Sequence, residues 1–335
     1  IPAYRDASGV TSEQAANYAA VVLQRVGGVA GLDPQGHRWY MQTTAIDDIQ
    51  NGEIAEILWR GDRTNGTDDW DLGIDQERKN FPPTLYGSGR LNPSQNLVDA
   101  FPAANGYPIS DTQSGYAESN PYLNRDPRLS EYIIYNGSRY RGKSIITGAY
   151  ADADGKTDDG MNAISTSTRT GYYLKKLLRS DCNPDPSATN AQYHFPVRIR
   201  YTELFLTYAE AANDAWGPTG TGTNAFSAYD VIKAIRKRAG VGVTNGDAYL
   251  ESVKSNQDKM TELIRNERRI ELCFENKRFW DLRRWKMPLD ETVTGMYITQ
   301  NADGSLKYER IDVEPRVFDN SYMCHGPLPS GEVLK

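Results

Sequence analysis

The segment from Trp59 to Trp70 contains the residue types that a binding site for a small polar ligand needs. Its two aromatic rings, Trp59 and Trp70, flank Arg60, Arg63 and Asp68. Aromatic faces can stack on the C–H surfaces of a sugar, and planar polar groups can pair with its hydroxyls. We therefore interpret this segment as a candidate sugar-binding element. An ordinary polar loop is the alternative.

Two other short segments combine aromatic and polar side chains in the same way. One is Trp39-Tyr40, and the other runs from Tyr86 to Arg90. The whole chain contains 21 Tyr and 6 Trp against 8 Phe, and Tyr and Trp suit half-exposed binding surfaces because each joins an apolar face to a polar tip. The arginines of these segments could instead hold carboxylates through paired hydrogen bonds, so a peptide stays open as a ligand beside an oligosaccharide.

An acidic stretch, ADADGKTDDG, offers a possible metal site. Asp152, Asp154 and Asp158 supply carboxylate oxygens at alternating positions, which suits a hard cation such as calcium. The residue order of an EF-hand loop is missing, so a solvated acidic turn is the other interpretation. Calcium is thus a possible ligand, and we expect no other cofactor.

The rest of the sequence gives no catalytic motif. The three histidines are scattered, and HExxH, GxSxG and a glycine-rich phosphate loop are all missing, so we expect a binding protein and not an enzyme. The net charge of −6 argues against nucleic acid, because phosphate binding needs a clustered positive field. Three cysteines without paired spacing predict neither a disulfide framework nor a zinc site. The sequence contains no run of about 18 apolar residues, the length that a helix needs to span a bilayer.

Hydrophobic periodicity predicts helices on both sides of a long loop-rich region. Residues 61–196 are dominated by Gly, Asn, Asp, Pro and Tyr, with only short strand-like pieces. The short connection between two predicted helices, 197–216 and 225–239, favours an antiparallel hairpin of the tetratricopeptide kind. Other predicted helices cover residues 12–26 (with Ser12 as N-cap), 258–275 and 279–285, and residues 52–60 could be a short helix or a strand.

These elements predict a mainly α fold, in which tetratricopeptide-like helical hairpins support a large irregular ligand-binding region with a few short strands. We expect a single domain over residues 1–335. It would consist of a helical part (1–60), the loop-rich binding region (61–196), the helical hairpins (197–286) and an irregular C-terminal segment (287–335).

Residues 264–285 read IRNERRIELCFENKRFWDLRRW. Glu267, Glu271, Glu275 and Asp281 lie among the arginines at spacings of three and four, which predicts ion pairs that fasten helices together rather than a basic patch. This segment closely resembles the C-terminal signature of the SusD/RagB family of outer-membrane nutrient-binding lipoproteins. Asn276 stands where that family usually has glycine, and asparagine also tolerates a left-handed backbone.

Further passages resemble the same family in the same order. They are LVDAF at 97–101, DPRL at 126–129, RIRYTELFLTYAEA at 198–211, IRKRAG at 235–240 and GPLPSGE at 326–332. The resemblance implies a helical superhelix of tetratricopeptide-like hairpins that carries an irregular ligand-binding face.

The resemblance also implies a role at the cell surface. Members of this family are lipid-anchored on the extracellular face of the outer membrane, above a TonB-dependent SusC-like barrel, and most capture a glycan while some capture a peptide. The family's lipidated N-terminal cysteine and first hairpins do not appear in this sequence, which we interpret as the C-terminal portion of such a protein. A structural or adhesive surface protein is a further alternative.

Overall fold

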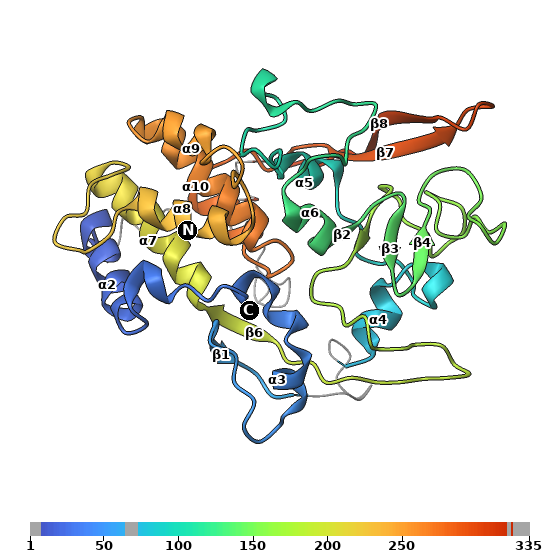
Figure 1. The fold of residues 1–335 in the computed structure, drawn as a ribbon, viewed down its shortest axis with the longest axis horizontal. Coiled ribbons are helices and arrows are strands. Elements are labelled where there is room, and N and C mark those ends of the chain that lie inside the picture. Colours follow the sequence, from blue (N-terminus) through green and yellow to red (C-terminus); the bar gives the residue numbers. More distant parts are fainter. Residues whose placement is uncertain (1–7, 64–72, 320–322, 324–335) are drawn as a thin grey trace, which may run out of the picture.

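The computed structural model describes residues 8–63, 73–319 and 323. Its helices gather on one side of the molecule, and the loop-rich region with its short strands lies on the other (Figure 1). The expectation of a mainly helical fold with a few short strands is confirmed. None of the helices in the described part is both long and apolar enough to cross a membrane.

The helical side is built around α2 (Ser12–Gln24), α7 (Tyr201–Trp216), α8 (Ala228–Arg238) and α10 (Gln257–Glu271). Each presents an apolar stripe to a shared core that includes Leu23, Phe205, Ile232 and Ile264, all almost fully buried. The N-cap of α2 is Thr11 and not Ser12, because Thr11 and Gln14 form a capping box. Shorter elements complete this side: η1 (Gly28–Gly31), η2 (Gly36–Met41), α3 (Thr43–Asp47), α9 (Ala248–Val253) and α11 (Arg278–Arg284).

The loop-rich region contains more regular structure than its composition predicts. Besides short strands, its described part holds three short α-helices and two 3₁₀ turns, which pack on two further apolar clusters. Helices this short carry too little periodicity to be recognised in a sequence rich in turn residues. The elements are α4 (Asp75–Asn80), η3 (Pro83–Leu85), α5 (Gln95–Ala100), η4 (Thr112–Ser114), α6 (Pro127–Tyr132), β2 (Ile133–Ile134), β3 (Ser138–Tyr140), β4 (Lys143–Ile145) and β5 (Tyr173–Leu174).

The described strands form antiparallel pairs, and one pair joins two segments that lie far apart in the sequence. β1 (Ile57–Arg60) pairs with β6 (Val197–Arg200), with Trp59 opposite Ile199. The prediction of a helix from residue 197 was therefore wrong for its first four residues, which form β6 instead. Val197 and Ile199 are β-branched, and such residues favour strands. β2 pairs with β5, and β3 pairs with β4.

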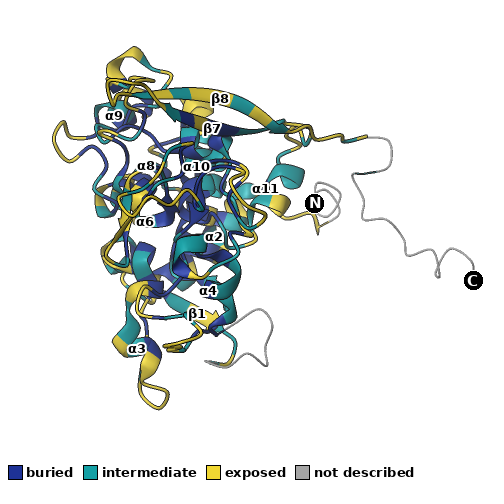
Figure 2. Cartoon of the chain, turned by 90° about the vertical axis from the view of Figure 1, so that its right-hand side faces the viewer, coloured by how far each residue is buried: buried dark blue, intermediate teal, exposed yellow. Residues whose placement is uncertain are grey.

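The described part of the C-terminal segment, residues 287–319, contains regular structure, which corrects the expectation of an irregular segment for that part of 287–335. It forms a long hairpin of β7 (Val293–Gln300) and β8 (Leu306–Glu314). The inner strand buries Met296 and Ile298 against the body, whereas β8 is largely exposed (Figure 2). Buried and exposed side chains alternate in the middle of β7 with a period of two. The exposed positions of the hairpin are mostly polar, so its sequence resembles that of the surrounding loops.

Buried ion pairs connect the helices, as the signature segment predicts, but most partners come from distant parts of the chain. The Arg128 guanidinium is fully buried and contacts Asp126 at 2.7 Å and both Glu267 and Glu271 at 3.0 Å. Only Asp281 pairs mainly with arginines of its own segment. Further members of the network are Glu56, Lys176, Arg200, Arg236, Arg238, Asp247 and Glu275.

Candidate functional site

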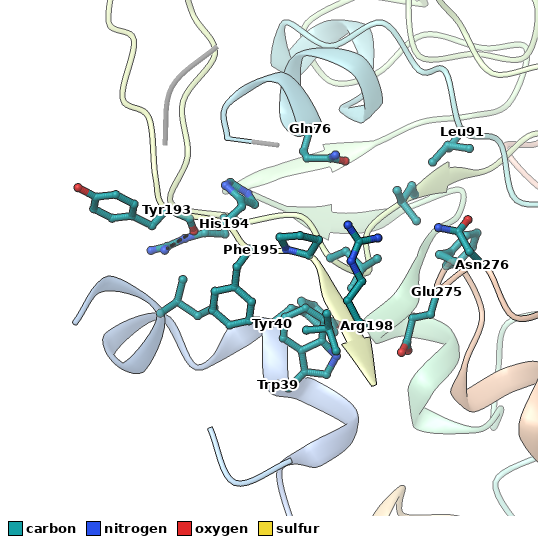
Figure 3. A pocket seen from close by; sticks show the side chains of 17 residues that line it. Trp39, Tyr40, Gln76, Leu91, Tyr193, His194, Phe195, Arg198, Glu275 and Asn276 are labelled. Carbon is teal, nitrogen blue, oxygen red and sulfur yellow. Dashed lines mark hydrogen bonds between the residues drawn. The ribbon is translucent and has the colours of Figure 1, made fainter. Parts of the chain in front are cut away.

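A cavity of about 480 Å³ opens where the helical side meets the loop-rich region (Figure 3). Its wall combines η2, α4, β5, β6 and the turn that follows α10. The lining residues are Trp39, Tyr40, Ile46, Gln76, Leu91, Leu174, Leu177, Arg179, Tyr193, His194, Phe195, Pro196, Val197, Arg198, Phe274, Glu275 and Asn276. Most are apolar or aromatic, and a few polar groups converge between them, which is the usual make-up of a small-molecule site.

Three stacked or edge-on rings form one wall of the cavity. Phe195 stacks on Trp39 with ring centroids 5.7 Å apart, and Tyr40 meets Trp39 edge to face at 6.0 Å. Trp39 and Tyr40 are buried, and Tyr40 donates a hydrogen bond to the carbonyl of Glu131. Burial raises the pKa of Tyr40 well above its ordinary value, so this hydroxyl keeps its proton. In the described part of the chain, the buried indole Nε1 of Trp39 has no hydrogen-bond partner.

Two arginines from the predicted binding segment pack on the same wall. The guanidinium of Arg60 lies 5.0 Å from the centroid of the Phe195 ring, and that of Arg63 lies 5.6 Å from it. Arg63 also donates to the carbonyls of Ala45, Ile49 and Gly52, so it ties α3 and its following loop to the wall. Arg60 donates only to the Gly61 carbonyl among the described residues.

Most charged groups in the cavity wall are already paired within the fold. Arg179 binds Asp47 and Asp181, each at 2.6 Å, and both carboxylates lie outside the wall. The carboxylate of Glu275 accepts from Lys176 and Arg200. The donors of Arg179 and the acceptors of Glu275 are therefore already occupied by protein groups and are less available to a ligand. His194 is likewise engaged at both ring nitrogens, by the Gln192 carbonyl and the Glu77 carboxylate.

Three polar side chains in the wall remain available to a ligand. Gln76 extends from α4, Asn276 from the turn after α10, and Arg198 rises from β6 into the space between them (Figure 3). The side chains of these three residues form no hydrogen bond or ion pair within the described part of the chain, although the backbone carbonyls of Gln76 and Arg198 accept from Asn80 and Lys277. Asn276 has a φ of 60°, the left-handed conformation predicted from its place in the signature. The wall therefore offers two planar amides and a guanidinium beside aromatic faces.

The structure brings together four of the residues predicted from sequence. Trp39, Tyr40, Arg60 and Arg63 all meet around Phe195, which sequence reasoning missed. Phe195 gave no signal of its own, because its role depends on the pairing of β1 with β6. The same holds for Gln76 and Arg198, which are 122 residues apart in the sequence and carry no local motif. Asn276 was singled out only for its backbone conformation and not as a site residue.

The other predicted site residues lie outside the cavity wall. Trp59 is 61% exposed on β1. Tyr86 is also exposed, and a hydrogen bond to Asp185 raises the pKa of its hydroxyl. Arg90 is exposed and directly precedes Leu91 of the wall. Asp68 and Trp70 are not among the described residues.

The acidic stretch does not assemble a metal site in the structure. Asp152 accepts hydrogen bonds from the backbone N–H groups of Asp154 and Lys156, so it stabilises its own turn. Among described residues, no three His, Cys, Asp or Glu side chains gather in a way that could hold a metal ion. Asp152, Asp154 and Asp158 thus form no calcium site here, because their backbone keeps the carboxylates in a solvated turn.

Comparison with known proteins gives one consistent relationship. A family model described as the SusD family matches residues 55–334. The SusD-like protein P38 of Formosa agariphila is 32% identical over 112 residues, which is 33% of this chain and 20% of that protein. The SusD-like protein P2 of the same organism is 31% identical over 93 residues, 27% of this chain and 17% of that protein.

Solved structures show the same fold. A SusD-like carbohydrate-binding protein from Bacteroides fragilis matches with a TM-score of 0.63 and 23% identity, over 84% of this chain and 54% of that one. A second SusD-like protein from B. fragilis matches with a TM-score of 0.62 and 23% identity, over 87% of this chain and 54% of that one. The chain thus spans about half the length of these structures, and the tetratricopeptide-like helical fold is confirmed.

Proposed function

The chain belongs to the SusD family, and from this premise we propose that it captures an oligosaccharide at the cell surface without cleaving it. The observation that carries the proposal is the cavity in Figure 3, where aromatic rings stand beside polar groups that the fold leaves unpaired. A sugar ring presents apolar C–H faces and equatorial hydroxyls, so it needs both kinds of surface at once. A SusD-like carbohydrate-binding protein also stands among the similar structures.

The cavity wall is poorly suited to hydrolysis. Glycoside hydrolysis usually needs two carboxyl groups that flank the scissile bond. Within the described residues, Glu275 is the one carboxylate in the wall, and Lys176 and Arg200 hold it. Burial alone would raise the pKa of Glu275, but the two cations outweigh it and lower that pKa, so this carboxyl cannot serve as a general acid near neutral pH.

We propose that the captured glycan passes to a TonB-dependent SusC-like barrel in the outer membrane. This part rests on family membership, because members act as lipid-anchored partners of such transporters on the extracellular face. Capture without chemistry fits that role, since a transporter needs the oligosaccharide delivered intact.

Affinity electrophoresis tests the capture step. The chain would be run through native gels that contain single polysaccharides, and each mixture would be analysed for released sugars. We expect retardation by at least one polysaccharide and no new reducing ends. If no polysaccharide retards the chain, glycan capture is wrong and peptide ligands come next. Released product would instead show an enzyme.

Variants then separate the cavity from the exposed surface beside it. Gln76→Ala removes one free amide from a short helix without adding strain, and we expect about 2- to 10-fold weaker retention, the effect of one neutral hydrogen bond. Trp59→Ala removes an exposed ring on β1 next to the cavity strand, and it should weaken retention of long chains more than of short oligosaccharides. Tyr18→Ala is the matched control, because that ring is 69% exposed on the distant face of α2. An equal loss in all three variants would contradict the assignment of the cavity.

A peptide remains the second candidate ligand. It is favoured by the guanidinium groups of Arg60, Arg90 and Arg198, for which the described residues supply no carboxylate. A panel of acidic peptides, tested in the same gels, would distinguish this case.

A further inference from the structure

We infer that the cavity selects an acidic sugar unit, one that carries a carboxylate or a sulfate ester. This inference rests on the proposed capture of a glycan and names the class of sugar. It depends on which charges in the wall are already paired and which are left for the ligand.

The fold pairs every charged side chain in the described wall except one. Arg179 is held by two carboxylates, and Glu275 is held by two cations. Arg198 lines the cavity with no ion-pair partner among the described residues. A ligand that enters therefore meets one uncompensated positive charge and no uncompensated negative charge in this wall.

The position of Arg198 suits an anionic group on a sugar ring. Its guanidinium lies between the amides of Gln76 and Asn276 and rises above the rings of the aromatic wall (Figure 3). A guanidinium can bind a carboxylate or a sulfate through two parallel hydrogen bonds, and such charge-assisted bonds are about twice as strong as neutral ones. The two flanking amides can then donate to the remaining oxygen atoms of the same group or to neighbouring hydroxyls.

A neighbouring feature adds to the preference for an anionic ligand. The guanidinium groups of Arg60 and Arg63 both lie over the Phe195 ring, so two further positive charges stand behind this wall.

The net charge of the whole chain makes the inference testable. The net charge of −6 disfavours non-specific attraction of the whole chain to an acidic polysaccharide. Retention by an acidic glycan would therefore report a local cationic site.

The test uses matched pairs of polysaccharides in affinity gels with the full chain. Polygalacturonate and alginate would be compared with their carboxyl-reduced forms, and carrageenan with its desulfated form; dextran and laminarin serve as neutral probes. We expect retention by at least one acidic polysaccharide and about tenfold or greater weakening when its charge is removed, the loss expected for a charge-assisted hydrogen bond. The two kinds of pair distinguish a carboxylate from a sulfate ester.

Variants of Arg198 link the preference to this side chain. Arg198→Gln should weaken retention of the acidic probe about tenfold or more, and Arg198→Lys should give an intermediate loss because it keeps the charge but not the paired geometry. Arg139→Gln is the control, since Arg139 is exposed on β3 and does not line the cavity. Circular dichroism checks that each variant folds.

The outcomes separate this inference from the proposed function. If a neutral polysaccharide is retained as strongly as every acidic one, or if Arg198→Gln leaves retention of the acidic probe unchanged, the acidic-sugar inference is wrong while glycan capture stands. If no polysaccharide is retained at all, the proposed function fails and this inference fails with it.

Discussion

The substitution Arg128→Met tests how strongly the buried ion pairs hold the fold together. Arg128 is fully buried, and its guanidinium contacts Asp126, Glu267 and Glu271. Methionine has a similar length and no charge, so the change removes the ion pairs and leaves the packing nearly filled. Removing one partner of a buried pair leaves the other as an uncompensated buried charge, which is strongly destabilising.

The structure indicates how many of the three carboxylates would be stranded. Without Arg128, Glu267 still has Arg236 as an ion-pair partner at 2.9 Å. Glu271 still has two ion-pair partners, Arg200 at 3.2 Å and Arg238 at 2.7 Å. Among the described residues, only Asp126 has Arg128 as its sole ion-pair partner. We therefore expect a loss of about 3–5 kcal/mol in the free energy of unfolding, the cost of one unpaired buried charge and not of three.

Urea unfolding, followed by far-UV circular dichroism and tryptophan fluorescence, measures this loss. Arg310→Met is the matched control, because Arg310 also binds two carboxylates, Asp99 and Glu118, but is 36% exposed. We expect that variant to lose at most about 1 kcal/mol. Adding Asp126→Asn to Arg128→Met should restore part of the loss, since asparagine removes the stranded charge and still caps α6. Equal losses for the two arginine variants, or no rescue by Asp126→Asn, would refute the reasoning.

Two further perturbations probe other buried contacts. Gly106→Ala should lower the free energy of unfolding in urea by about 2–4 kcal/mol, because the φ of Gly106 is 95° and the new Cβ would lie 2.5 Å from Asp247 Oδ1. The control Gly137→Ala has a φ of 81° but open space around the Cβ, so it should cost only about 1–2 kcal/mol. Equal losses in the two variants would argue against the clash. Burial, opposed by the Glu271 carboxylate, lowers the pKa of His37 to about 3 from its ordinary 6.5. The unfolded chain therefore binds a proton that the folded chain refuses between these pH values, and stability should fall as the pH drops from 6.5 toward 3. In thermal unfolding over the same pH range, the stability of His37→Asn should fall less than that of the unchanged protein. Identical pH profiles for the two proteins would contradict this role of His37.

The long helices were predictable from sequence because each buries one stripe against a shared core. α2, α7, α8 and α10 all begin and end within a few residues of the predicted bounds, apart from the first turn assigned to α7. Val197–Arg200 could not be recognised as a strand, because its partner Ile57–Arg60 lies far away in the chain. The same long-range pairing builds the aromatic wall, so the site was less predictable than the helices.

The candidate site was predicted only where the residue type alone carries information. Trp39 and Tyr40 were proposed because two adjacent aromatic residues with polar groups stand out in the sequence, and both line the cavity. Phe195 and Arg198 were missed because neither stands in a local pattern. Their importance comes from what β6 places around them, namely Arg60 on one ring face and an open cavity beside the guanidinium.

The supply of carboxylates by the fold distinguishes the buried structural arginines from Arg198, the arginine that we propose to bind the ligand. Arg128 meets Glu271 across 143 residues of sequence, so no local spacing could reveal that its charge is consumed. Arg198 lies two residues from Arg200, yet Arg200 is buried among three glutamates and Arg198 faces the cavity. Residues two apart in a regular strand point to the same face, but the pairing of β6 with β1 is irregular, and Arg200 already forms the N-cap of α7. Arg200 is therefore buried while Arg198 is exposed at the cavity. One short strand thus supplies both a buried arginine that is paired within the fold and, two residues earlier, the arginine that we propose to bind the ligand.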